Sequence, residues 1–435
     1  MAETSIRVAI IGGGLAGATL ARALTKHDSL DVQVYEAGSF KERGAGVGIQ
    51  SNALRALDQI IPSAMKMLVE QAGAVPTCAA RFLMGCGPEA GSCLFDLDSG
   101  SQKVSVHRAS LLRELLAPLP NNMLHANKRL VGIDTSNLSA RIEVEFEDGT
   151  KDHFDAVIGA DGIFSSVRKY VLQEKAEQYT ASPAGFWDCR NLVLLDKAIE
   201  ALGETYFEVD RQWYVLKVPI LHAWNDWVGD GAFLLHCVVE NKTMVQCIIS
   251  GIDEEAAYKD RRRPITKEEL EKALSSWSDN PVSGAMISLI LDQPNTQGYS
   301  QWEHKSTPTY ANDRICIMGD AAHAMTPWQG AGAGQAIEDA LILATVLGRI
   351  TSRKEIPAAF QAFDAVRRPR CQQLVDSSKE TGRIMCGRSD ARDPDTLREA
   401  LKDRWNFIYN LDVEQHKQEA LQKLREFQSL CLNST

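Results

Sequence analysis

The stretch that decides the fold is RVAIIGGGLAGATLARAL, residues 7–24. Residues 8–11 (VAII) are apolar, as expected of a strand buried on both faces of a parallel sheet. A glycine-rich turn follows, and the apolar residues after it, through Leu24, predict a helix. Residues 31–35 (DVQVY) then predict a second strand. The sequence therefore predicts a βαβ unit and, with it, an α/β protein.

The glycines of this unit have the spacing of a dinucleotide-binding turn, Gly12-x-Gly14-x-x-Gly17. Gly12 permits a tight turn, Gly14 lets the backbone approach a pyrophosphate, and Gly17 allows the helix to pack closely on the strand. The N-terminus of the helix attracts the phosphates. Glu36, at the end of the second strand, is placed to accept hydrogen bonds from an adenosine ribose. These features predict a bound dinucleotide and leave FAD and NAD both open.

The composition is that of an ordinary globular protein, since 44% of the 435 residues are apolar and 24% are charged. The formal net charge of −10 argues against a broad attraction to nucleic acid or to an anionic membrane. The apolar stretch at residues 8–24 is too short and too rich in glycine to span a membrane, and Arg22 interrupts it. Ten cysteines without a C-x-x-C pair argue against a disulfide scaffold and against a metal site. We therefore expect a soluble protein of the reducing cytoplasm that holds no metal.

A second glycine-rich turn follows a predicted buried strand at residues 314–318 (RICIM). Asp320 stands where this strand ends, and a carboxylate there accepts hydrogen bonds from a ligand hydroxyl. The run at residues 330–333 precedes a helix predicted to begin near Gly334, whose N-terminus offers backbone N–H groups to an oxygen or a phosphate. No second strand–helix–strand–acid unit accompanies this turn. One extended cofactor, touched at several points, is therefore favoured over two separate nucleotides, and FAD is long enough for that role.

The composition and hydrophobic pattern of the sequence change between residues 181 and 297. Aromatic residues and alternating strands dominate there, and no helix is predicted before residue 266. This region predicts a separate α+β substrate domain with a mostly antiparallel sheet. The predicted fold is a Rossmann-like FAD-binding domain of the glutathione-reductase type into which the substrate domain is inserted. The expected boundaries are 1–75, 103–178 and 298–390 for the FAD-binding domain, 76–102 and 179–297 for the substrate domain, and 391–435 for a C-terminal helical segment.

Six further segments are spread over nearly the whole chain: GGGLAG (12–17), GAGVGIQSNA (44–53), VHRASL (106–111), GADGIFSSVR (159–168), GDAAHAMTPWQGAGAGQAIEDA (319–340) and VRRPR (366–370). Together they resemble the flavin-dependent aromatic hydroxylases. Within that family the chain most resembles the salicylate 1-monooxygenases, through the pattern TPxQGAGAGQxxED and the tail RWNFIYNLDVE (404–414). The resemblance implies FAD as cofactor, NADH or NADPH as reductant and O₂ as the source of oxygen.

The resemblance also implies which residues bind FAD. They are Gly12, Gly14 and Gly17 at the pyrophosphate, Glu36 at the adenosine ribose, Gly48, Ile49 and Arg108 elsewhere on FAD, Asp161 at FAD and the passing nicotinamide, Asp320 at the ribityl chain, and Gly332, Ala333 and Gly334 at the isoalloxazine. Backbone N–H groups at the last three positions would stabilise negative charge on the reduced flavin. His323, in the same loop, is interpreted as structural.

The implied reaction is hydroxylation of a phenolic acid. In salicylate, or in a ring-substituted 2-hydroxybenzoate of the orsellinate type, the attacked carbon bears the carboxylate, so CO₂ leaves and a catechol or hydroquinone forms. The alternative within the family is ortho-hydroxylation or oxidative dearomatisation of a phenolic polyketide intermediate in secondary metabolism. From another class, the alternative is a non-catalytic flavin-fold binding protein, against which the intact glycines argue. We expect a monomer or homodimer whose partner is a small aromatic acid or phenol.

A site for an anionic aromatic substrate needs a cationic side chain to bind the anion and an apolar pocket to hold the ring. Arg190 is the candidate anchor for a carboxylate or phenolate, because a guanidinium binds such oxygens bidentately, and an exposed strand arginine is the alternative. His236 is the candidate for removing the phenol proton, with a satisfied core histidine as the alternative. Tyr214 and Trp213 are further candidates for the catalytic pocket. Trp328 stands where the bacterial salicylate enzymes have a histidine, which leaves the exact acid open.

Overall fold

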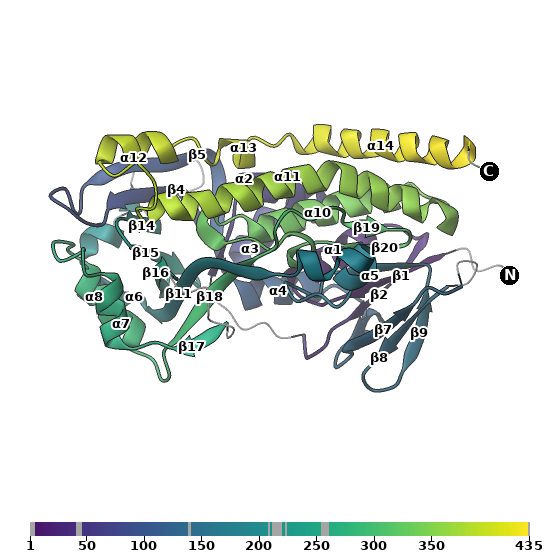
Figure 1. The fold of residues 1–435 in the computed structure, drawn as a ribbon, viewed down its shortest axis with the longest axis horizontal. Coiled ribbons are helices and arrows are strands. Elements are labelled where there is room, and N and C mark those ends of the chain that lie inside the picture. The colour runs from purple at the N-terminus through teal and green to yellow at the C-terminus, as the bar shows by residue number, and fades with distance from the viewer. Residues whose placement is uncertain are drawn as a thin grey trace.

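A computed structural model describes residues 5–40, 46–137, 141–207, 209–210, 220–221, 224–253 and 261–433. Its two large sheets lie toward opposite ends of an elongated molecule, and the helices of the C-terminal part run along one side of it (Figure 1). One sheet is mainly parallel and the other is mainly antiparallel. The predicted mixed α/β fold class is confirmed.

The six-stranded sheet contains the predicted βαβ unit and has the strand order β19-β20-β10-β1-β2-β6. Its strands are β1 (Ile6–Ile11), β2 (Leu30–Tyr35), β6 (Leu124–His125), β10 (Ala156–Gly159), β19 (Ala311–Asn312) and β20 (Ile315–Ile317). All neighbours are parallel except β19 with β20. A separate antiparallel sheet of β7 (Leu130–Asp134), β8 (Ile142–Phe146) and β9 (Lys151–Phe154) packs beside β1. The sheet thus brings residues 6–11, 156–159 and 315–317, far apart in the chain, side by side.

Helix α1 (Leu15–Leu24) begins at the glycine turn and connects β1 to β2. Gly12 has a φ of +110°, and a Cβ there would lie 2.3 Å from the carbonyl oxygen of Ala160. A Cβ on Gly17 would lie 1.9 Å from the carbonyl oxygen of Gly12. Only glycine fits at either position, so α1 packs directly on the sheet. The other helices of this part are α2 (Ser51–Ile60), α3 (Ala64–Glu70), α4 (Arg108–Leu116), α5 (Arg168–Leu172), α9 (Asp320–His323) and α10 (Gly332–Leu347).

The nine-stranded sheet has the order β17-β18-β11-β16-β15-β14-β4-β5-β3. Its strands are β3 (Gly46–Ile49), β4 (Val75–Met84), β5 (Cys93–His107), β11 (Ser182–Leu194), β14 (Trp224–Val228), β15 (Ala232–Val239), β16 (Met244–Ile252), β17 (Arg262–Pro264) and β18 (Gln297–Glu303). Every neighbouring pair is antiparallel except β14 with β4. β12 (Val209–Asp210) and β13 (Ile220–Leu221) form a separate pair. The mostly antiparallel sheet that the sequence predicts is therefore present.

Three helices pack with one face of the nine-stranded sheet: α6 (Leu195–Leu202), α7 (Lys267–Ala273) and α8 (Ser283–Leu291). α6 differs from the expectation that no helix precedes residue 266. Its Ala198 and Leu202 are four residues apart and both are buried in the core shared with α8, so a single apolar face is enough to dock it. A helix of eight residues is too short to show a clear helical period in the sequence.

The C-terminal part consists of α11 (Ile356–Met385), α12 (Pro394–Leu401), α13 (Asn406–Tyr409) and α14 (Val413–Asn433). The first half of α11 is buried with the six-stranded sheet, whereas Leu374, Ile384 and Met385 are buried with the nine-stranded sheet. α14 lies along α11 (Figure 1). α11 therefore joins the two halves of the molecule. Among the described residues, no helix is long and apolar enough to cross a membrane.

Candidate active site

A cavity of about 810 Å³ lies between the two large sheets. Ten of the twelve residues predicted to bind the cofactor line it: Gly12, Gly14, Glu36, Gly48, Ile49, Arg108, Asp161, Asp320, Gly332 and Ala333. The other two, Gly17 and Gly334, support this wall from behind. Gly17 packs on the Gly12 carbonyl, and a Cβ on Gly334 would lie 3.1 Å from Cβ of Ala53 on α2. Segments remote in the sequence thus converge on one continuous surface.

Glu36 is held in place by backbone amides. Its Oε2 accepts a hydrogen bond from the Gly13 N–H at 2.9 Å, and its Oε1 accepts one from the Gly38 N–H at 2.9 Å. These bonds orient the carboxylate and leave a lone pair on each oxygen. The carboxylate can therefore also accept hydrogen bonds from the hydroxyls of a ribose.

Two helices point their N-termini at the cavity. The N-cap residues are Gly14 for α1 and Ala331 for α10, and neither has a side-chain cap. The backbone N–H groups of both first turns are thus not used by side-chain caps and can serve a ligand. α10 is 16 residues long, so its dipole places partial positive charge at Gly332 and Ala333. Such a site suits a phosphate at α1 and an anionic ring system at α10.

Asp161 also lies in the wall of the cavity. Its Oδ2 accepts hydrogen bonds from the N–H groups of Ser166 at 2.7 Å and Val167 at 3.3 Å. Burial nevertheless raises the pKa of the Asp161 carboxyl. Asp320, by contrast, is exposed at the start of α9.

This part of the cavity fits FAD. The cradle at Gly12 cannot hold a side chain, so the backbone there approaches a ligand closely. Gln50 also lines the cavity; its Nε2 donates to the carbonyl oxygen of Gln329 at 2.7 Å, whereas its buried Oε1 has no partner among the described residues. Such an oxygen is satisfied by a ligand that donates a hydrogen bond. Gly12, Glu36, Asp161 and the two helix N-termini would hold the cofactor.

The other part of the cavity is lined mainly by large apolar and aromatic side chains: Phe82, Phe233, Leu235, Trp328, Trp405 and Tyr409. Trp328 is 7% exposed, and its ring stands edge-on to Phe186 and Phe233 with centroids 5.0 and 5.4 Å apart. Aromatic walls of this kind keep water away from a bound ring. Trp328, a predicted substrate-binding residue, thus lies in the aromatic wall of the cavity.

Arg190, on β11, lines the same part of the cavity and is paired with Asp188. Its Nη2 and Nε donate to Oδ1 of Asp188 at 2.6 and 3.1 Å. This neighbouring carboxylate raises the pKa of the Arg190 guanidinium. Nη1 makes no hydrogen bond within the described part of the chain, and it can bind a substrate oxygen.

His236, on β15, lies in the protein core and does not line the cavity. It is fully buried beside Tyr206, Phe207 and Trp227, and neither ring nitrogen has a partner among the described residues. Burial lowers the pKa of the imidazole to about 3, so the ring is neutral. The structure favours the core alternative over a role in proton removal. Trp213 and Tyr214 lie outside the described residues.

Two charged residues of the pocket were not anticipated from the sequence, Asp226 on β14 and Lys103 on β5. Asp226 is 6% exposed, and the indole N–H of Trp224 donates to its Oδ1 at 2.9 Å. Burial raises the pKa of the Asp226 carboxyl to about 7. The only available signal was a charged residue inside the strand WNDWV, residues 224–228, which does not alternate between polar and apolar residues and so does not reveal which face meets a ligand.

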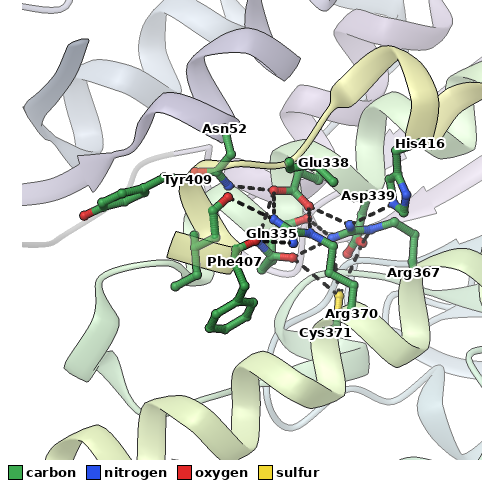
Figure 2. Close-up of polar contacts among 12 residues, drawn as sticks. Asn52, Gln335, Glu338, Asp339, Arg367, Arg370, Cys371, Phe407, Tyr409 and His416 are labelled. Atoms are coloured by element: carbon green, nitrogen blue, oxygen red, sulfur yellow. Dashed lines mark hydrogen bonds and ion pairs between the residues drawn. The ribbon is translucent and has the colours of Figure 1, made fainter. Parts of the chain in front are cut away.

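A buried ionic network connects α10 to α11 (Figure 2). Arg367 is fully buried and donates to Oε2 of Glu338 at 2.6 Å and to Oδ1 of Asp339 at 2.8 Å. Although burial alone would raise the pKa of the Glu338 carboxyl, Arg367 and Arg370 lower it to about 2. His323 contacts Asp339 through Nε2 at 2.6 Å, in keeping with the structural role expected for it. The network is therefore ionised and fixes α10 on α11.

Arg370 extends this network to the C-terminal part (Figure 2). It donates to Glu338 at 2.8 and 3.0 Å and to the carbonyl oxygens of Phe407 and Ile408 at 3.0 and 3.3 Å. Trp405 and Tyr409 flank these carbonyls and line the cavity. The same ions that hold α10 on α11 therefore also position one wall of the proposed substrate pocket.

Comparison with known proteins agrees with this site. The family described as FAD binding domain matches residues 5–378. The 6-methylsalicylate 1-monooxygenase of Aspergillus terreus is 33% identical over 96% of this chain and 92% of its own length. A salicylate hydroxylase of Pseudomonas putida is 30% identical over 96% of this chain and 94% of its own length. The solved structure of a salicylate hydroxylase in a substrate complex superposes with a TM-score of 0.80 at 26% identity, covering 96% of this chain and 98% of that one. The chain therefore belongs to the FAD-binding-domain family of FAD-dependent monooxygenases, with FAD as its cofactor.

Proposed function

We propose that this monooxygenase hydroxylates salicylate or a ring-substituted 2-hydroxybenzoate, with loss of CO₂ and formation of a catechol or hydroquinone. NADH or NADPH and O₂ would be its co-substrates. The observation that carries the proposal is one continuous cavity in which an aromatic-lined part containing Arg190 adjoins the FAD-binding part. The names of the relatives, 6-methylsalicylate 1-monooxygenase and salicylate hydroxylase, support the same substrate class.

FAD, when bound, accepts a hydride from the nicotinamide and activates O₂ for transfer of one oxygen atom to the ring. The residues of the chain would bind the cofactor, orient the substrate and exclude water from the pocket. The N–H groups of Gly332 and Ala333 would stabilise negative charge on the reduced cofactor. Phe233, Trp328 and Tyr409 would exclude water from the substrate ring.

Arg190 would anchor the substrate carboxylate. Asp188 is 5% exposed and accepts hydrogen bonds from Nε and Nη2 of Arg190, which fixes the orientation of the guanidinium. Nη1 makes no hydrogen bond to Asp188 and can bind the substrate. A guanidinium oriented in this way loses less rotamer freedom when it binds a carboxylate.

A panel of hydroxybenzoates and phenols tests the proposal. For each compound, NAD(P)H oxidation, O₂ uptake, CO₂ release and product mass are measured with the FAD-loaded enzyme. Decarboxylative hydroxylation predicts equal amounts of CO₂ and of a product with one hydroxyl in place of the carboxylate. A product that keeps its carbon count and gains one oxygen would instead establish ortho-hydroxylation or dearomatisation.

Replacing Arg190 with alanine tests the anchor. A hydrogen bond to a charged group contributes about 1.5–3 kcal/mol, so KM for a 2-hydroxybenzoate should rise by about 10- to 150-fold in Arg190→Ala. The matched control is a phenol without a carboxylate, for which KM should change little. An unchanged KM for the carboxylated substrate would exclude Arg190 as the anchor.

We further propose a monomer or homodimer that works in the reducing cytoplasm. In the described part of the chain, eight cysteines have described side chains and all are free, which supports a reducing compartment. The two large sheets support the proposed division into an FAD-binding and a substrate domain, although β3 and most of β18, which the expected boundaries assign to the FAD-binding domain, pair within the nine-stranded sheet.

A further inference from the structure

Asp226 is a carboxylate of the proposed substrate pocket that the mechanism has not yet used. Its strand, β14, lies between β15 and β4, where Leu235 and Phe82 are its register partners. Leu235, Phe82 and Asp226 all line the cavity. The carboxylate therefore reaches the ligand space between two apolar side chains, in the part of the cavity where a substrate ring would lie.

The hydrogen bonds of Asp226 leave one oxygen available. Trp224 donates its indole N–H to Oδ1, and Oδ2 accepts no hydrogen bond from the described residues. Asp226 lines the cavity, so a ligand hydroxyl can donate a hydrogen bond to Oδ2. Because β14 holds the backbone of both residues, Trp224 and Asp226 form a fixed pair with Oδ2 free for a ligand.

The charged and titratable groups around Asp226 come from three neighbouring elements. Lys103, from β5, favours the ionised carboxylate. Tyr409, from α13, and Cys237, from β15, are both buried, and the field of Asp226 contributes to raising the pKa of each. Both groups are therefore neutral at ordinary pH. Among the described residues, Lys103 is then the one cation that contributes to the electrostatics of Asp226. Its charge stabilises a negative charge on the Asp226 carboxylate or on the oxygen of a bound phenolate.

The second carboxylate of the pocket, Asp188, differs in its partner. Asp188 is bound to the guanidinium of Arg190 at 2.6 Å, whereas the Asp226 carboxylate receives only a neutral indole donor. The Asp188 carboxylate therefore already accepts two hydrogen bonds from a cationic group. Burial raises the pKa of Asp226 to about 7, the range in which a group can both take up and release a proton.

We propose that Asp226 accepts the proton of the substrate's phenolic hydroxyl, an assignment that rests on the proposed function. The O–H bond of the phenol breaks, the proton bonds to Oδ2 of Asp226, and the electron pair stays on the substrate oxygen. The phenolate so formed raises the electron density at the ring carbon that receives the oxygen atom. The indole N–H of Trp224 orients the carboxylate, and the positive charge of Lys103 stabilises the negative charge. The proton leaves Asp226 for solvent after the product departs.

The variant Asp226→Asn keeps the size of the side chain and can keep the Trp224 hydrogen bond, but it cannot accept the proton. With a hydroxybenzoate substrate, kcat should fall by about 100-fold or more while KM changes much less, and the limb of the kcat/KM pH profile that rises toward neutral pH should disappear. Asp226→Glu should restore part of the activity. The matched control, Asp96→Asn, removes a carboxylate from β5 in the same sheet but outside the cavity and should behave like the wild type.

A second readout follows the proton directly and needs no turnover. The probe is 2-hydroxy-5-nitrobenzoate, whose phenolate absorbs at longer wavelength than the phenol, added to the oxidised FAD enzyme without NAD(P)H. The wild-type complex should show the phenolate band, growing as pH rises through the titration of Asp226. The Asp226→Asn complex should show the phenol form. The wild-type titration also tests the assignment if the variant fails to fold.

Two outcomes separate the assignment from the proposed function. If the wild type hydroxylates hydroxybenzoates and the folded, FAD-loaded Asp226→Asn variant keeps both the phenolate band and the pH limb, the function stands and the assignment of Asp226 is wrong. If the wild type neither binds nor hydroxylates any hydroxybenzoate or phenol, the proposed substrate class is wrong and the assignment fails with it.

Discussion

Replacing Glu338 with glutamine tests whether the buried ionic network holds the two halves of the site together. The carboxylate accepts hydrogen bonds from Arg367 at 2.6 Å, from Arg370 at 2.8 and 3.0 Å, and from Asn52 at 2.6 Å. Glutamine keeps the volume but removes the charge and turns one acceptor into a donor that faces a guanidinium. Arg367 is fully buried, so it would be left with Asp339 as its one anionic partner among the described residues.

The expected loss of stability follows from this burial. Removing one partner of a buried ion pair costs about 3–5 kcal/mol, and here two guanidinium groups lose an anionic partner while Arg367 keeps Asp339. The entropy of unfolding is about 2.1 cal/mol/K per residue, or about 0.9 kcal/mol/K for 435 residues. The midpoint of thermal unfolding should therefore fall by about 3–6 °C in Glu338→Gln. KM for the aromatic substrate should rise as well, because Arg370 positions the segment that carries Trp405 and Tyr409.

The assay is thermal unfolding of the FAD-loaded protein, followed by circular dichroism and by the fluorescence of released FAD. The matched control is Glu399→Gln, which breaks an exposed ion pair with Lys402 in which Glu399 is 67% exposed. An exposed pair contributes about 0–1 kcal/mol, so this control should shift the midpoint by about 1 °C or less. If Glu338→Gln unfolds at the same temperature as the control, the buried network does not stabilise the fold.

Three further predictions concern the cofactor turn, the pocket wall and pH. Gly17→Ala should yield protein without FAD or no folded protein, measured by the flavin absorbance of the purified chain, because its Cβ would lie 1.9 Å from the Gly12 carbonyl oxygen; an FAD-loaded variant would contradict the proposed packing. Gly382→Ala should raise KM more for ring-substituted hydroxybenzoates than for salicylate, because its Cβ would lie 2.3 Å from Nε1 of Trp328 and push the indole toward the cavity; equal effects on both substrates would argue against this displacement. Asp226→Asn should be more stable than the wild type above pH 7 but not near pH 4. The pKa of this carboxyl rises from 3.8 to about 7 on folding, so the folded state keeps a proton that the unfolded state loses between these values, and stability falls by up to about 4 kcal/mol as pH rises through this window. Urea unfolding at pH 5 and pH 8 measures the difference, and a gap that does not widen with pH would refute it.

The FAD-binding half could be predicted from the sequence because its determinants are local. Gly17 packs against the carbonyl oxygen of Gly12, a near neighbour in the chain, and Glu36 follows directly after the next strand. A short segment with the right glycines can adopt only this geometry next to a buried strand, so the motif specifies both the βαβ unit and the dinucleotide. The family resemblance then distinguished FAD from NAD, which the geometry of the turn by itself does not.

The substrate half depends on strand register, which the sequence does not show. Asn225 pairs with His236 and Asp226 pairs with Leu235, so His236 and Asp226 point to opposite faces of one sheet. β15 is buried at every position, so no alternation of polar and apolar residues marks the face that meets the cavity. His236 therefore looks as suitable as any polar strand residue until the sheet is assembled.

The sequence by itself thus determined the fold class and the residues of the glycine turns, since these depend on contacts between near neighbours in the chain, and its resemblance to a family added the identity of the cofactor. Only the tertiary structure decided that Asp226 faces the cavity, that His236 faces the core, and that Arg370 links Glu338 to Ile408. These contacts join residues on different strands and helices, and which of them form depends on how the sheets and helices pack together.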